Sequence, residues 1–502
     1  MKNLKKRTAS LLLAILSVAS MAVSCSSGSS DNTSEPENNA DTSATETTAA
    51  ETEIPTIPES LPNMNYDGYV FRMLTTDEVG SVRYSFELDT DTMNGEVLND
   101  AVYERNAAVE EKYGIELKQV HFAKSGFQQA FQNSVTAGDD SYDLFFHNIQ
   151  ACMKIGYLYA LPVDELPYID LSQKWWNRIF MESTALGGVN YGLSGDINLV
   201  DDNNTWILFF NKVLAAERDL GDMYSHVYDG TWTIDLLSKL CADVTEDVNG
   251  DGTLNYLDRW GMYASNNSAA AMLWAAGGMY GTLDDNGEIE MHIDSEHNIN
   301  VLEKLHSLIA DTSKVILAVR DIPDGINGVN SYTYSYTIFS ERRTLISSGA
   351  LVSLEYLRDM DDEFGYLPNP KYSEAQEKYY STTQEKTATM FLVPKTAPDP
   401  ERTSIILEAM ASASSKIVIP AYYDVQLARK YSRDDESEAI LDIIFENRVL
   451  DPVQAFNFGK VQTAIPGIMM NTTNTIASTI ASLKTSAQAD YDNTLKAILE
   501  AK

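Results

Sequence analysis

The chain has 502 residues, with 37 basic and 73 acidic side chains that give a formal net charge of −36 at pH 7. So large an acidic excess argues against binding to nucleic acid and against direct binding to an anionic membrane surface. The length exceeds what one hydrophobic core can serve, so we expect two or more lobes. Only three cysteines occur, which excludes a scaffold held by several disulfides.

The N-terminus has the pattern of an export signal. A basic head between Lys2 and Arg7 precedes an apolar run over residues 11–23 that carries no charge. This run is shorter than the roughly 20 apolar residues of a membrane span, and it is typical of a signal peptide. We therefore expect residues 1–24 to be removed on export, and we expect no later stretch of the chain to span a bilayer.

The residues after the apolar run resemble the cleavage site of bacterial lipoproteins. Residues 22–25 read Ala-Val-Ser-Cys, although the first position of that motif is usually Leu. In such proteins the cysteine thiol receives a diacylglycerol and becomes the new N-terminus. The prediction is a lipid on Cys25 that holds the protein at the extracellular face of the cell membrane. Ordinary secretion with a free thiol at Cys25 is the alternative.

Two further cysteines, Cys152 and Cys241, remain in the body of the chain. They could form one disulfide, but the sequence does not show whether they lie close enough to pair. Two buried thiols are the favoured interpretation.

Residues 25–63 are predicted to be a disordered acidic linker. They consist mostly of Ser, Thr, Asn, Ala and Pro with scattered acids, and no Lys or Arg occurs between Arg7 and Arg72. Such a segment has too little apolar surface to offset its ordering entropy, and its acidic charges repel one another. The linker would let the folded body stand away from the membrane.

The first part of the body alternates predicted strands and helices, namely strand 69–74, helix 98–113, strand 115–120, helix 127–137 and strand 142–146. Gly114 and Gly138 follow the two helices, where glycine commonly ends a helix. The alternation predicts an α/β fold with a largely parallel sheet, whose ligands bind beyond the carboxyl ends of the strands. Asp77, His147 and Asn148 would lie at that edge.

Several short segments follow one another in an informative order: 99–106 (Asn-Asp-Ala-Val-Tyr-Glu-Arg-Asn), 142–146 (Tyr-Asp-Leu-Phe-Phe), 161–166 (Leu-Pro-Val-Asp-Glu-Leu), 206–212 (Trp-Ile-Leu-Phe-Phe-Asn-Lys), 230–233 (Gly-Thr-Trp-Thr), 339–349 and 364–368 (Phe-Gly-Tyr-Leu-Pro). In order and spacing they resemble the extracellular solute-binding proteins of ABC sugar importers, the broad group that includes maltose-binding protein. The resemblance covers roughly residues 65 to 460.

This resemblance implies a two-lobed fold of the type II periplasmic-binding-protein kind. Each lobe would be a mostly parallel sheet flanked by helices, and crossing strands would form the hinge. The first lobe would span 64–204 and the second 205–338, with 339–395 returning to the first lobe and a helical region at 396–502. A ligand would lie in the cleft between the lobes, which would close over it.

The function implied by the resemblance is capture of a mono- or oligosaccharide by a monomeric binding protein, which delivers it to the membrane permease subunits of an ABC transporter. A receptor for another solute such as a peptide is the first alternative, and a secreted glycan-acting enzyme is the second. The chain has no Gly-x-Ser-x-Gly nucleophile motif, no phosphate-binding Gly-Lys-Thr loop and no His-Glu-x-x-His zinc motif. We therefore predict a binding protein rather than an enzyme.

A sugar site needs planar hydrogen-bonding groups for hydroxyls and an aromatic face for the C–H side of the ring. Six candidate contacts follow from the resemblance: Asp77, His147, Asn148, Asn204, Trp274 and Ser348. The alternative for Trp274 is core packing, and Trp232 and Trp260 are expected to be core residues. The alternating tyrosines of 332–336 predict one face of a strand.

Residues 247–258 fit the twelve-residue calcium loop of EF-hand type. The predicted ligands, at positions 1, 3, 5, 7 and 12, are Asp247, Asn249, Asp251, Thr253 and Asp258. Gly252 occupies the sharp turn at position 6, and Asp258 replaces the usual Glu. Because Ca²⁺ takes six to eight hard oxygen ligands, we predict one structural Ca²⁺ here. The alternative is an Asx-rich turn without a metal.

Overall fold

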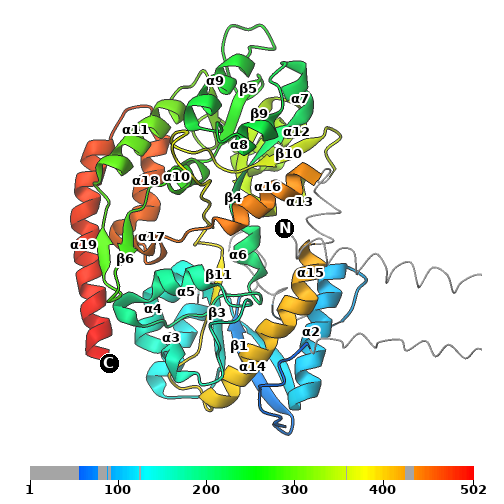
Figure 1. The fold of residues 1–502 in the computed structure, drawn as a ribbon, viewed down its shortest axis with the longest axis vertical. Helices are drawn as coiled ribbons and strands as arrows, with labels where there is room; N and C mark the ends of the chain where they lie inside the picture. Colours follow the sequence, from blue (N-terminus) through cyan, green and yellow to red (C-terminus); the bar gives the residue numbers. More distant parts are fainter. Residues whose placement is uncertain are drawn as a thin grey trace, which may run out of the picture. The chain divides into compact units, whose positions relative to one another are not determined.

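The computed structural model describes residues 56–76, 88, 92–123, 126–357, 359–423 and 435–501. They belong to one unit of the chain, Pro55–Lys502 (Figure 1). The predicted signal peptide, Cys25, most of the predicted linker and the ligand candidate Asp77 lie outside the described residues.

The first sheet contains the strands that the sequence predicted for the start of the body. Its order is β11-β3-β1-β2, with bounds β1 (Tyr69–Thr75), β2 (Ile115–His121), β3 (Leu144–Asn148) and β11 (Thr389–Leu392). Strands β2, β1 and β3 are parallel, and only β11 runs antiparallel, beside β3. The predicted parallel arrangement is confirmed. Strand β3 begins two residues later than predicted and includes His147 and Asn148.

Two helices of this part end where the sequence predicted. Helices α2 (Val97–Tyr113) and α3 (Phe127–Ala137) are followed by Gly114 (φ 59°) and Gly138 (φ 70°), both left-handed. Glycine adopts this conformation without the penalty that a Cβ imposes. At Gly114 a Cβ would also lie 2.5 Å from Oδ1 of Asn65, so a larger residue would displace the Asn65 side chain.

The second sheet has five strands in the order β10-β4-β9-β5-β8. Their bounds are β4 (Trp206–Asn211), β5 (Trp260–Ala264), β8 (Val315–Leu317), β9 (Thr344–Ala350) and β10 (Phe364–Leu367). Strands β9, β5 and β8 are parallel, whereas β4 is antiparallel to both of its neighbours. This sheet is therefore more mixed than expected.

The two predicted crossing strands are neighbours in the second sheet. Strand β4 pairs with β9 along most of its length, and Trp206 lies opposite Ala350. Strands β9 and β10 both stay in this sheet, so the chain rejoins the first sheet only at β11 rather than at residue 339. The largest cluster of buried apolar residues includes members of both sheets, for example Phe145 and Leu345.

Helices cover both sheets. Those between β3 and β10 are α4 (Ile149–Tyr159), α5 (Arg178–Thr184), α6 (Leu199–Asn203), α7 (Lys212–Glu217), α8 (Met223–Tyr228), α9 (Ile234–Val244), α10 (Asn266–Ala275), α11 (Glu296–Ile309), α12 (Ser331–Ser340) and α13 (Leu354–Leu357), with a hairpin of β6 (Gly281–Leu283) and β7 (Ile289–Met291). The predicted strand at 332–336 is wrong, because these tyrosines lie in α12, which Asn330 caps through the backbone N–H of Thr333.

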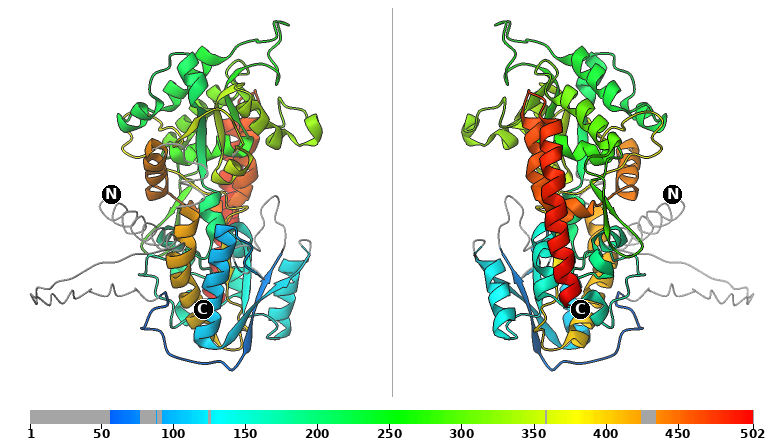
Figure 2. Two further views of the ribbon diagram at one scale, coloured as in Figure 1. Left: turned by 90° about the vertical axis from the view of Figure 1, so that its right-hand side faces the viewer. Right: turned by 90° about the vertical axis from the view of Figure 1, so that its left-hand side faces the viewer.

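The predicted C-terminal helical region consists of α14 (Pro400–Ala413), α15 (Ile419–Ala421), α16 (Asp435–Glu446), α17 (Pro452–Ala455), α18 (Val461–Met470) and α19 (Ile476–Ala501), with a π-helical turn at Ser414–Val418. Helix α19, red in the right-hand view of Figure 2, packs against α4, α11 and α18. The run Pro400–Ala421 is long and apolar enough to cross a membrane, contrary to expectation. Its apolar window is 67 % buried, so we assign it to the core of the body.

Packing decides several of the open residue assignments. Cys152 and Cys241 are free thiols, each fully buried, and burial raises the pKa of both. The interpretation as two buried thiols is confirmed. Trp232 and Trp260 are core residues as expected, with exposed fractions of 0 % and 3 %.

Candidate ligand-binding site

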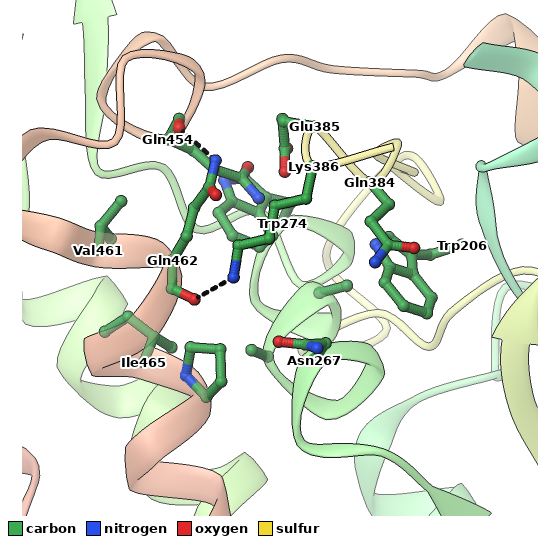
Figure 3. A pocket seen from close by; sticks show the side chains of 13 residues that line it. Trp206, Asn267, Trp274, Gln384, Glu385, Lys386, Gln454, Val461, Gln462 and Ile465 are labelled. Atoms are coloured by element: carbon green, nitrogen blue, oxygen red, sulfur yellow. Dashed lines mark hydrogen bonds between the residues drawn. The ribbon is translucent and has the colours of Figure 1, made fainter. Parts of the chain in front are cut away.

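A pocket lies where α10, α18, the start of β4 and the turn at 384–387 meet (Figure 3). Its polar and aromatic wall residues include Trp206, Asn267, Trp274, Glu385, Gln454 and Gln462. About 430 Å³ in the pocket and at its mouth is free of atoms, but the centre of a water molecule fits into only about 40 Å³ of this space. Ligand pockets usually measure at least about 300 Å³, so the walls must separate before a sugar can enter.

Two tryptophans form the aromatic part of the wall. Trp274 is only 4 % exposed; its indole N–H donates to Oδ2 of Asp451 at 3.1 Å, and its ring meets that of Tyr280 edge to face at 5.6 Å. Trp206 is half-buried at the start of β4, where its backbone N–H donates to the Thr382 carbonyl at 2.9 Å. The Trp274 ring is thus fixed in place, and the Trp206 ring is the more accessible of the two.

Asp451 organises this wall from behind. It caps α17 through the backbone N–H groups of Val453 (2.9 Å) and Gln454 (3.3 Å), and it also accepts from Tyr280 N (2.5 Å) and Trp274 Nε1. Burial raises the pKa of Asp451 to about 6, while these hydrogen bonds hold it down. With four donors, the carboxylate is fully satisfied, and it belongs to the support of the pocket.

Three other wall residues carry acceptors that lack donors. Glu385, Gln454 and Gln462 are 3 %, 6 % and 7 % exposed, and Oε1 of each is buried with no hydrogen-bond partner among the described residues. The amide of Gln462 is oriented unambiguously, because its Nε2 donates to the Gln454 carbonyl at 2.8 Å. Leaving a buried acceptor unpaired costs about 1–3 kcal/mol, so donors from solvent or a ligand are expected here.

The pocket has one carboxyl and one ammonium group in its wall. Burial raises the pKa of Glu385 to about 8. Lys386 is half-buried, donates from Nζ to the Gln462 carbonyl at 3.1 Å, and has a pKa lowered by burial. Figure 3 shows this Lys386 contact beside the Gln462–Gln454 bond. The wall thus holds a carboxyl that burial favours in its neutral form beside an ammonium that is already hydrogen-bonded, and this suits an uncharged polar ligand.

The structure gathers three of the predicted ligand residues around the turn that carries Glu385. Trp274 lines the pocket itself. Asn204 supports the turn, since its carbonyl accepts from Gln384 N at 3.0 Å and its Oδ1 accepts from Thr387 Oγ1 at 2.7 Å. Asn148 caps α4, accepting from Ala151 N at 2.8 Å. The next residue, Ile149, donates its N–H to the Ala388 carbonyl at 2.9 Å.

The structure does not bring His147 and Ser348 to this pocket. His147 is 8 % exposed, and its ring centroid lies 4.3 Å from that of Phe127. Ser348 is buried within β9, opposite Leu208 of β4. Asp77 is outside the described residues. His147 and Ser348 are thus part of the packing in the structure described, and their role as contacts stays a prediction.

Sequence reasoning missed Glu385, Gln454, Gln462 and Trp206 as wall residues. Trp206 was assigned only to a crossing strand, although a tryptophan at the head of such a strand is itself a signal. The other three carry no local pattern, because the fold alone joins the turn before β11 to α17 and α18.

The predicted calcium loop adopts a tight turn held by its own side chains. Asp247 accepts from two backbone N–H groups of the loop at 2.7 and 2.8 Å, and Asn249 and Asp251 each accept from the N–H two residues on. Asp258 is fully buried and accepts two more. In the described part of the chain, no three His, Cys, Asp or Glu side chains are grouped closely enough to hold a metal. Calcium at 247–258 therefore stays a prediction.

No model of a protein family matches this chain, and no curated protein matches it. Solved structures do. UspC of M. tuberculosis is 16 % identical with a TM-score of 0.56, covering 84 % of this chain and 99 % of its own. An ABC substrate-binding protein of Listeria monocytogenes in complex with cycloalternan is 13 % identical with a TM-score of 0.53, and the match covers 86 % of this chain and 99 % of that protein. The maltose/maltodextrin-binding domain MalE of Bdellovibrio bacteriovorus bound to maltotriose is 14 % identical with a TM-score of 0.52, and the match covers 84 % of this chain and 100 % of that domain.

This chain has the two-lobed fold of ABC substrate-binding proteins. The fold class predicted from the sequence is thereby confirmed. At these identities the likeness concerns the fold, and the ligand has to be argued from the pocket itself.

Proposed function

We propose that the protein is the extracellular substrate-binding subunit of an ABC importer and that it captures a carbohydrate without chemical turnover. The observation that carries this proposal is the pocket wall, in which two tryptophans stand beside three buried oxygens that need donors. Sugars present both complements, since their hydroxyls donate hydrogen bonds and their C–H faces pack on aromatic rings. Structures with this fold hold cycloalternan and maltotriose.

Capture on this proposal requires a change in the distance between the walls. Helix α10 follows β5 of the second sheet, whereas the turn at 384–387 leads into β11 of the first. Movement of one sheet relative to the other would thus widen or narrow the pocket. A ligand favours the closed arrangement only through contacts that it makes better there, and the segments that join the two sheets, just before β4 and between β10 and β11, are suited to act as the hinge.

The test is calorimetry and thermal shift on the exported chain against neutral mono- and oligosaccharides, including maltotriose and cycloalternan, and against short peptides. We expect a sugar to bind and to raise the melting temperature. Trp206→Ala should weaken binding of that sugar about tenfold, which corresponds to about 1.4 kcal/mol. Tyr228→Ala should leave binding unchanged, because Tyr228 is 53 % exposed and is not among the wall residues. Binding of a peptide and of no sugar would refute the assignment.

We further propose that a lipid on Cys25 anchors the monomer outside the cell, so that the permease subunits meet the loaded body at the membrane. The support is the motif at residues 22–25 and the acidic tether after it. Cys25→Ala should move the protein from the membrane fraction to the medium or leave its signal uncleaved, as fractionation and mass spectrometry would show. Normal processing with retention in the membrane would contradict the anchor.

The loop 247–258 is proposed to bind one structural Ca²⁺, on the strength of its ligand spacing. An ion that binds only the folded state stabilises by mass action, by about 2.7 kcal/mol at 100 times its Kd. Chelation should thus lower the melting temperature, and Asp251→Ala should abolish the difference. Identical melting curves with chelator and with excess calcium would exclude the site.

A further inference from the structure

Among the described residues of the pocket wall, Glu385 carries the one carboxyl group, and one oxygen of this group lacks a hydrogen-bond partner. It is 3 % exposed, and its Oε1 has no hydrogen-bond partner among the described residues. Asp451, equally buried and close by, receives four donors. Two carboxyls in one region thus differ in that one is bound by the protein and the other has an acceptor left over.

The charged groups that face Glu385 do not supply the hydrogen-bond donor that its Oε1 lacks. Lys386, its neighbour in the turn, directs Nζ to the Gln462 carbonyl at 3.1 Å instead of pairing with the Glu385 carboxyl. Burial is the main influence on the pKa of Glu385. The residue's own backbone N–H lowers this pKa by donating to the carboxyl, Asp451 at the start of α17 raises it by charge repulsion, and Lys386 lowers it. Helix α10 contributes only uncharged residues to this wall, and α18 contributes Gln462. Burial dominates and raises the pKa of Glu385 to about 8, so its carboxyl carries a proton at neutral pH.

We propose that hydroxyl groups of the ligand bind Glu385, Gln454 and Gln462, and that this capture releases the proton of Glu385 to the solvent. Hydroxyl donors stabilise the ionised carboxylate more than the neutral acid, so a ligand that supplies them lowers the carboxyl's proton affinity. The protein starts with COOH and ends with COO⁻ bonded to ligand O–H groups, and one proton leaves to the buffer. This inference rests on the proposed function and specifies which groups of the same site bind the ligand's hydroxyls.

A pH dependence of affinity follows from this release. The bound state holds fewer protons than the free state between the two pKa values of Glu385, so affinity rises with pH in that window. The upper limit of the window is the ligand-free pKa of about 8. The rise can reach tenfold per pH unit when one full proton is released, and affinity levels off above the window.

The experiment is calorimetry of the full exported chain at pH 7 with maltotriose, or with the tightest sugar of the panel above, in phosphate and in Tris. These buffers differ in ionisation enthalpy, so a released proton changes the observed heat. We expect up to one proton to be released by the wild type and none by Glu385→Gln, whose amide keeps an acceptor and removes the titration. The matched control is Glu377→Gln, an exposed glutamate in the segment before the turn, which should behave as the wild type.

The outcomes separate the two proposals. If a sugar binds the wild type with the same heat in both buffers, the proton release is refuted and the carbohydrate function stands. This arm needs no variant, so it remains decisive even if Glu385→Gln does not fold. If Glu385→Gln releases the same proton as the wild type, Glu385 is not its source and the inference fails. If no sugar binds, the proposed function fails and this inference fails with it.

Discussion

Two regions of this protein combine a buried glutamate with a pair of tryptophans, and they differ in how completely the glutamate is hydrogen-bonded. Glu408 of α14 accepts from the indole N–H groups of Trp175 (3.0 Å) and Trp176 (2.8 Å) and from Asp170 N (3.2 Å). Glu385, beside Trp206 and Trp274, has an acceptor oxygen with no such donor. Both glutamates are 3 % exposed, so burial does not distinguish them.

This difference separates the two glutamates by role, because one completes a hydrogen-bond network within the fold and the other has an oxygen free for a ligand. A finished network such as that of Glu408 fixes the packing of α14 against the loop that carries Trp175 and Trp176. A network that leaves a buried polar group without a partner lowers stability, and such unpaired groups are retained at functional sites. The comparison therefore assigns stability to Glu408 and recognition to Glu385, and substitutions at Trp274, Glu408 and Glu385 test that division.

The largest effect is expected where the two roles overlap, at Trp274. Trp274→Ala removes a large ring that is 4 % exposed and leaves Oδ2 of Asp451 with one donor fewer. We expect a loss of about 3–5 kcal/mol in unfolding free energy, measured with urea, and weaker sugar binding of roughly tenfold. If the variant loses stability but binds normally, Trp274 is a packing residue, and the recognition face belongs to Trp206 alone.

A smaller loss, confined to stability, is expected at Glu408. Glu408→Ala leaves two buried or half-buried indole N–H groups without their acceptor, and each unpaired donor costs about 1–3 kcal/mol. The unfolding free energy should fall by about 3 kcal/mol, while the sugar affinity of the folded variant should not change. A change in affinity that matches the change in stability would erase the distinction between the two regions.

The fold of the first sheet could be predicted from the sequence because its signals are local. Apolar runs of strand length alternate with helical spacing, and Gly114 and Gly138 mark the helix ends. The alternating tyrosines of 332–336 gave a wrong prediction of a strand, because the cap at Asn330 and the packing of Tyr334 stabilise a helix there. Local alternation by itself does not distinguish a strand from a helix whose tyrosines lie on several faces.

Only those residues of the candidate site that lie in a recognisable local sequence pattern could be predicted. Trp274 was found because the resemblance places an aromatic residue in that part of the second lobe, and it does line the pocket. Glu385 and Gln462 are separated by more than seventy positions and meet through tertiary packing. Whether a carboxyl oxygen keeps or lacks a donor is a property of that packing, and no spacing in the sequence encodes it.

The smallest effect, and the sharpest division between the regions, is expected from Glu385→Gln on stability. The folded-state pKa of Glu385 is raised from 4.5 to about 8, so the folded protein binds the extra proton between these values. The stability that this proton contributes is fully present below about pH 4.5 and is lost as the pH rises toward about 8. The glutamine variant has no such titration. We therefore expect Glu385→Gln to gain stability relative to the wild type between pH 5 and pH 6, by on the order of 1–2 kcal/mol. Urea unfolding at the two pH values measures this gain.

Glu408→Gln provides the contrast, because it breaks a complete hydrogen-bond network and should be less stable than the wild type at both pH values. A Glu385→Gln variant that is destabilised like Glu408→Gln would show that Glu385 too is held by the protein, and the pocket would lose its unfinished carboxyl.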